Sequence, residues 1–145
     1  MKKLPMHFPV LRVNESHIRQ FRSLDELSRM TRKYFDLGGF KRDAYFIDSE
    51  GKKFAIENVT VNRRSWHIAY WFGPSPAIIV EVAVGMPTQQ LTLDEMKSLV
   101  IDLVVKNRWY RQGGETEKKF RNAFEGFQSI AELMKHISFY GEWQG

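Results

Sequence analysis

Apolar residues in this 145-residue chain are spaced as in helices near both ends and as in strands between them. Near the start they recur every three or four residues, which is typical of a helix that buries one face. The set is Leu24, Leu27, Thr31, Tyr34 and Phe35. The pattern predicts an N-terminal helix, and the pair of glycines that follows would end it.

Four stretches in the middle of the chain favour strands, because they are rich in β-branched and aromatic residues or alternate between two faces. They are 44–47, 52–63, 66–72 and 78–84. A turn over 48–51 would join the first two as a hairpin. The four together predict an antiparallel meander.

Residues 8–13 also have strand-forming content. Pro9 provides no backbone donor, so an edge strand or an extended arm is favoured over a central strand.

The stretch from Leu93 to Val105 is the most apolar of the helical segments. It predicts a helix that is buried nearly all round and lies across the sheet as the main core element. We expect this helix to end around Asn107.

The C-terminal part of the chain predicts two short helices. Phe120, Phe124 and Phe127 have the spacing of one helical stripe, but Gly126 favours a break before a last helix that begins at Ser129. The tail over 139–143 would either pack back on the fold or fray.

Three of the predicted helices begin with a capping motif. Residues 21–27 and 127–133 share the pattern Phe-x-Ser-aliphatic-x-Glu-Leu, and Thr92 with Glu95 repeats the device. In such a box the hydroxyl accepts a bond from the N–H three residues on, while the glutamate reaches back to the cap. Seven matching positions are more simply explained by convergent capping chemistry than by a duplication.

These patterns predict a single α+β domain over residues 1–145. It would hold an antiparallel meander of about four strands, an N-terminal helix, a buried central helix and a short C-terminal helical segment. A chain of this length can bury enough apolar surface to fold alone.

The composition narrows the class of protein. The chain has no cysteine, which excludes disulfides, thiolate zinc sites and cysteine nucleophiles and favours a cytoplasmic location. Its start has basic residues but no apolar run behind them, so we expect no signal peptide. The longest apolar run is too short to cross a bilayer, so no membrane association is expected.

The net charge of +5 is unevenly spread. Residues 1–42 carry ten Lys/Arg and four Asp/Glu, residues 43–105 carry five and eight, and residues 106–145 carry seven and five. Basic ends on one side of the sheet would attract an acidic protein or a nucleic-acid backbone. A solvated helix surface is the alternative.

No catalytic, metal or phosphate-binding motif is present, and we predict no cofactor, no metal and no enzymatic activity. The four histidines are scattered, and His136, one helical turn after Glu132, is more typical of a surface hydrogen bond than of a ligand pair. An enzyme acting through Glu57, Glu81 or His67 ranks last among the hypotheses.

Two clusters combine arginine with tryptophan, a mixture that is enriched at protein hot spots and at single-stranded nucleic-acid platforms. The candidate partner-binding residues are Arg63, Arg64, Trp66, Arg108, Trp109 and Arg111. In the alternative interpretation, both tryptophans are core residues covered by arginine stems.

In size and layout the chain resembles the immunity proteins that bacteria encode beside polymorphic or contact-dependent growth-inhibition toxins. The resemblance rests on a small cysteine-free domain with a Phe-x-Ser-Leu-x-Glu-Leu helix near the start, a meander, an apolar helix and a Phe-x-Ser-Ile-x-Glu-Leu helix near the end. It implies a non-catalytic inhibitor that binds a cognate toxin domain in the cytoplasm. A basic nucleic-acid-binding module is the alternative function.

Overall fold

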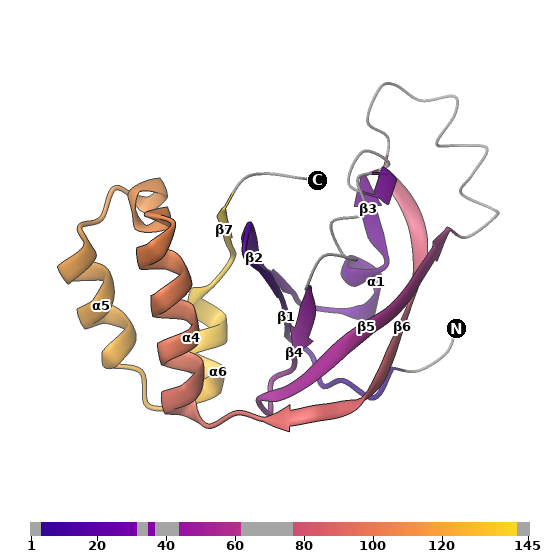
Figure 1. Cartoon of the computed structure of the whole chain (residues 1–145), viewed down its shortest axis with the longest axis horizontal. Helices are drawn as coiled ribbons and strands as arrows, with labels where there is room; N and C mark the ends of the chain where they lie inside the picture. Colours follow the sequence, from indigo (N-terminus) through magenta and orange to yellow (C-terminus); the bar gives the residue numbers. More distant parts are fainter. Residues whose placement is uncertain (1–3, 32–34, 37–43, 62–76, 142–145) are drawn as a thin grey trace.

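A seven-stranded antiparallel sheet forms the larger part of the fold (Figure 1). The structure is a computed structural model that describes residues 4–31, 35–36, 44–61 and 77–141. In chain order the strands are β1 (Val10–Asn14), β2 (His17–Phe21), β3 (Arg29–Thr31), β4 (Tyr45–Ile47), β5 (Lys52–Val61), β6 (Ala77–Gln90) and β7 (Phe139–Gly141). Their order across the sheet is β3-β6-β5-β4-β1-β2-β7. The α+β class is confirmed, but the sheet has more strands than the predicted four.

The first strand is central, so the prediction of an edge strand or arm is wrong. β1 lies between β2 and β4, and all of its residues are buried. Pro9 precedes the strand, so the donor that it lacks is not needed in the ladder. β2, which follows β1 after a tight turn, was not predicted.

The predicted N-terminal helix is interrupted: the described residues form a first helical turn, then a strand, and are helical again at 35–36. α1 (Leu24–Leu27) is followed directly by β3, which pairs with β6. The amide of Val80 donates to the carbonyl oxygen of Ser28 at 2.7 Å, and Met30 is buried against β6. Pairing with a distant strand therefore overrides helical spacing in this segment.

The predicted hairpin is confirmed as β4 and β5. Asp48 is fully buried in the turn, where its carboxylate accepts backbone bonds from His7, Glu50 and Lys52 at 3.0–3.2 Å. β6 extends beyond the predicted 78–84, and the strand predicted over 66–72 lies outside the described residues.

Four helical segments pack on one face of the sheet (Figure 1). They are α4 (Leu93–Lys106), the 3-10 helix η2 (Trp109–Gly113), α5 (Glu117–Glu125) and α6 (Ile130–His136). None of the described helices is long and apolar enough to cross a bilayer.

The central helix α4 ends at the predicted place, with Asn107 as its C-cap. It is not buried nearly all round. Only one face, which includes Met96, Val100 and Val104, is fully buried, and other apolar residues such as Leu99 remain partly exposed.

The two C-terminal helices are confirmed, with Gly126 as the C-cap of α5. Phe124 packs between Phe120 and Phe127, with ring centroids 4.5 and 5.1 Å apart. The tail packs back as β7, which pairs with β2 at an edge of the sheet.

The opposite face of the sheet carries a second apolar cluster. It includes Val10, Phe21, Phe46 and Phe54, and it is covered by Leu27 of α1 and by Met6 and its neighbours in the N-terminal segment. The sheet is therefore covered on both faces in this region, as a largely buried sheet requires.

The predicted hydroxyl caps are present at all three helix starts. Ser23, Thr92 and Ser129 each accept a bond from the amide three residues on, at 3.2 Å. Glu95 reaches back to the amide of Thr92 itself, which completes a capping box. In the two matching heptapeptides the glutamate reaches one residue further, to the amides of Arg22 and Gln128.

Replacing Thr92 with alanine is expected to lower the free energy of unfolding by about 1 kcal/mol, because the amide of Glu95 loses its cap. Urea denaturation followed by circular dichroism would measure the change. Thr92→Ser keeps the hydroxyl and serves as the control. Equal losses in the two variants would show that the methyl group of Thr92, not its hydroxyl, stabilises the helix start.

Candidate functional site

Half of the predicted partner-binding residues lie where the structure describes them. Arg63, Arg64 and Trp66 fall outside the described residues, so the first Arg/Trp cluster stays a prediction. The second cluster forms the junction between α4 and η2.

Trp109 points into the protein. It is 8% exposed and belongs to the main core cluster, together with residues of α4, α5 and α6. This burial favours the interpretation of Trp109 as a core residue over that of an interface anchor.

The segment η2 is held at two points. Trp109 anchors it to the core, and the side-chain amide of Gln112 forms two bonds with the backbone of Gly141 in β7, at 2.6 and 3.1 Å. Arg108 and Arg111 remain exposed on the outer side of this anchored segment.

Arg108 adopts an unusual backbone conformation. Its φ of 57° places it in the left-handed region, just after the C-cap of α4. Glycine is the common residue at this position because a side chain costs energy there. An arginine at such a position lowers the stability of the fold, which indicates that it serves a role other than stabilising the protein.

Several exposed cations lie on the segments at the end of the helical layer where α4 ends and α5 begins (Figure 1). We call this surface the basic end; it consists of Lys106, Arg108, Arg111, Lys118 and Lys119. No residue that the structure describes forms a salt bridge with any of the five. The basic end is thus a positive surface with its charges available to a partner.

Two of these cations are placed against the helix dipole. Lys118 and Lys119 lie in the first turn of α5, where positive charge is unfavourable. Two carboxylates precede them in the chain: Glu117 pairs with Arg121 at 3.8 Å, and Glu115 lies close enough to Tyr140 to help burial raise the pKa of that phenol to about 12. The dipole of α5 therefore does not explain the two lysines.

The structure also contains a buried polar cluster that the sequence analysis missed. The Arg12 Nε donates to His17 Nε2 at 3.0 Å, and the amide of His17 donates to the Asn14 carboxamide oxygen at 2.9 Å. The guanidinium groups of Arg12 and Arg19 lie over the Phe21 ring, 5.0 and 4.9 Å from its centroid. These side chains share the sheet face that carries the second apolar cluster.

The imidazole of His17 is neutral in this environment. Burial, with the nearby Arg12 and Arg19 charges as further causes, lowers the pKa of His17 from 6.5 to about 3. Arginine only donates, so the Arg12 bond occupies the Nε2 lone pair and leaves the proton on Nδ1. So weak a base is not suited to general acid–base catalysis near neutral pH.

The acid–base and metal candidates are not brought together in the described part of the chain. Glu81 stands opposite Thr60, whereas Glu57 lies in a bulge of β5 beside Gly85. The His136 ring packs on Phe124. No three potential metal ligands lie together among the described residues. His67 falls outside the described residues.

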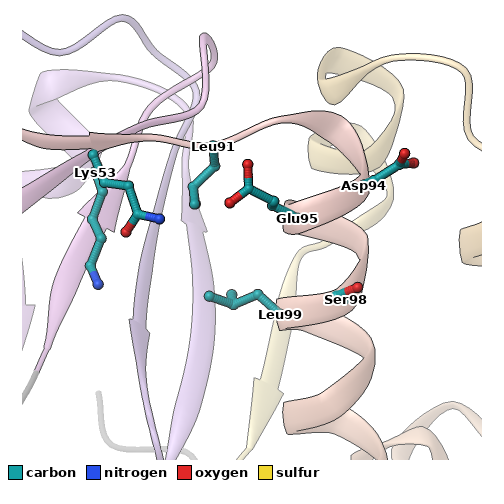
Figure 2. Close-up of a pocket in the computed structure, with 7 residues that line it drawn as sticks. Lys53, Leu91, Asp94, Glu95, Ser98 and Leu99 are labelled. Carbon is teal, nitrogen blue, oxygen red and sulfur yellow. The ribbon is translucent and has the colours of Figure 1, made fainter.

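A shallow, open pocket of about 420 Å³ lies between β5, the end of β6 and the start of α4 (Figure 2). Figure 2 shows Lys53 on the sheet side and Glu95 and Leu99 on the helix side. Its main charged groups have roles within the fold: Glu95 caps α4, and the Lys53 ammonium lies 4.2 Å from the Tyr45 ring centroid. We assign no ligand to this pocket.

Comparison with known protein families, with curated proteins and with solved structures found no match. The functional interpretation therefore rests on the geometry of the chain itself.

Proposed function

We propose that this chain is a non-catalytic binding protein that inhibits a protein with an acidic surface, as an immunity protein neutralises a cognate toxin domain in the cytoplasm. The basic end would be its contact surface. The observation that carries the proposal is Arg108, an exposed arginine held in a left-handed conformation. It shares the basic end with four further cations that form no salt bridge with any described residue.

The geometry of the basic end supports a binding role. Its backbone is anchored by Trp109 and Gln112, so the arginines lose little backbone freedom when a partner binds. Clustered positive charge speeds association with an acidic surface and disfavours basic partners. Arginine also forms planar, two-pronged bonds with carboxylates.

A nucleic-acid-binding module is the second candidate, supported by the net charge of +5 and by the same cations. Binding to a phosphate backbone releases counterions, so its affinity falls steeply as salt is raised. A flat salt response, or no binding of duplex DNA or single-stranded RNA at low salt, would reject this candidate.

Replacing Arg108 with glycine is expected to stabilise the fold and weaken binding. The free energy of unfolding should rise by about 1 kcal/mol, because glycine adopts the left-handed conformation without strain. Affinity for a toxin-like protein, if an adjacent gene encodes one, should fall roughly tenfold or more, as on loss of an arginine hot spot. Urea denaturation and calorimetric titration would measure the two effects.

The matched control is Lys135→Ala, which removes an exposed cation of α6 outside the basic end. Its affinity should stay near that of the wild type. An unchanged affinity in Arg108→Gly, or no complex between the wild-type chain and its neighbour's product, would contradict the proposal.

A further inference from the structure

The strand β6 is much longer than its outer neighbour. β5 pairs with it from Val80 to Gln90, whereas β3 pairs only with 77–79 (Figure 1). One further bond, from the Val80 amide to the Ser28 carbonyl oxygen, closes this side. Beyond Val80, no strand that the structure describes lies along the outer side of β6.

The hydrogen-bonding groups on this outer side can be assigned. Val80 directs its amide toward β3, and backbone groups alternate between the two sides of a strand. Val82 and Val84 therefore direct their N–H and C=O groups outward. Glu81 and Ala83 direct theirs toward β5, where they stand opposite Thr60 and Asn58.

A cavity of about 460 Å³ lies beside this part of β6, and four consecutive residues of the strand, 80–83, line it. Ser28, which also lines the cavity, accepts a bond from the Val80 amide on the outer side of β6, so the cavity reaches this edge. Asn58 and Thr60 line it too, so it also extends over β5. Its remaining lining residues are Leu4 and Leu24.

We propose that this slot accepts an extended peptide segment of a partner protein, which adds to the sheet as a strand beside β6 and places a basic side chain near Glu81. The peptide would occupy the line along which β3 ends, antiparallel to β6 as is every other pair in the sheet. Strand addition of this kind gains affinity from main-chain bonds and specificity from alternate side chains.

The charge of the edge favours a basic peptide. Glu81 is exposed, lines the cavity and forms no salt bridge with any residue in the described part of the chain. A lysine or arginine on the peptide would supply the missing opposite charge.

The walls of the slot favour a single peptide over a second copy of the chain. Leu24 of α1 and Leu4 of the N-terminal segment line the cavity together with β6. A lone strand brings no layers of its own, whereas the edge of another folded sheet carries covering layers that would meet these two residues. The slot lies on β6, apart from the basic end, and the proposal does not rest on the proposed function.

Amide hydrogen exchange followed by NMR tests the open edge directly. In the free chain the amides of Val82 and Val84 should exchange faster than those of Glu81 and Ala83, which are bonded to β5. The probe is an acetylated and amidated hexapeptide of threonine, valine, lysine, valine, threonine and valine. Adding it should slow exchange at Val82 and Val84 roughly fivefold to tenfold at saturation, as one hydrogen bond per amide allows.

Variants separate backbone pairing from side-chain contact. Val82→Pro removes an outward donor, and proline is tolerated where an edge strand faces away from its neighbour. Its affinity for the hexapeptide should fall about tenfold. The matched variant Val82→Ala keeps the donor, so its affinity should stay much closer to that of the wild type. Glu81→Gln should weaken binding by roughly threefold, as for an exposed ion pair. If Val82→Pro does not fold, a hexapeptide methylated on its valine nitrogens removes the same bonds from the other side.

Three results would overturn the proposal. Val82 and Val84 could exchange as slowly as Glu81 and Ala83 in the free chain, which would mean that the edge is already covered. The hexapeptide could leave their exchange unchanged at millimolar concentration. Sedimentation could show a dimer that Val82→Pro abolishes, which would make a second copy the occupant.

Discussion

Replacing Trp109 with alanine is expected to lower the free energy of unfolding by about 3–5 kcal/mol. The indole is buried in the main core, where its loss leaves a cavity among residues of three helices that cannot fully collapse. Urea denaturation at neutral pH would measure the change. A loss of this size is a large part of the total stability of a small domain.

The control is Arg111→Ala, an exposed position on the same 3-10 helix. It should change the free energy of unfolding by less than about 0.5 kcal/mol. If Trp109→Ala instead folds as stably as wild type and loses only partner binding, Trp109 is an interface anchor.

Acidification is expected to destabilise the chain through His17. The unfolded imidazole binds a proton below its usual pKa of 6.5, whereas the native one, with a pKa of about 3, does not. Between these values the unfolded state holds more protons, so the free energy of unfolding falls as pH falls, by about 1.4 kcal/mol per pH unit from this group. Above pH 6.5 this contribution is constant.

The comparison that isolates His17 is with His17→Gln, measured by urea denaturation at several pH values from 7 to 4. Glutamine keeps an acceptor for Arg12 but does not titrate in this range. Carboxylates titrate in both proteins, so they cancel in the difference between the two. Parallel pH profiles would mean that the native pKa of His17 is not depressed.

Structural features that depend on contacts between residues close in the sequence could be predicted from the sequence. The caps at Ser23, Thr92 and Ser129 and the break at Gly126 depend only on residues within one helical turn. The turn at Asp48 is local in the same sense, because its carboxylate bonds mainly to amides two and four residues on.

Features that depend on distant pairing could not be predicted. Residues 29–31 have helical spacing but form a strand because β6 offers its edge there. Arg12 and His17 meet only through the register of β1 with β2, which no spacing rule gives in advance. The basic end was found in part: Arg108 and Arg111 were chosen for their neighbours in the chain, whereas Lys118 and Lys119 join them only when α5 packs beside α4.

The pairing of β2 with β7 has a consequence for the order in which this chain folds. Residues 17–19 find their edge partners only at 139–141, so that side of the sheet stays open until β7 docks. Closing so long a loop is slow compared with forming the local hairpins. We expect this edge to close late in folding, and until then β2 is the surface that a chaperone would shield.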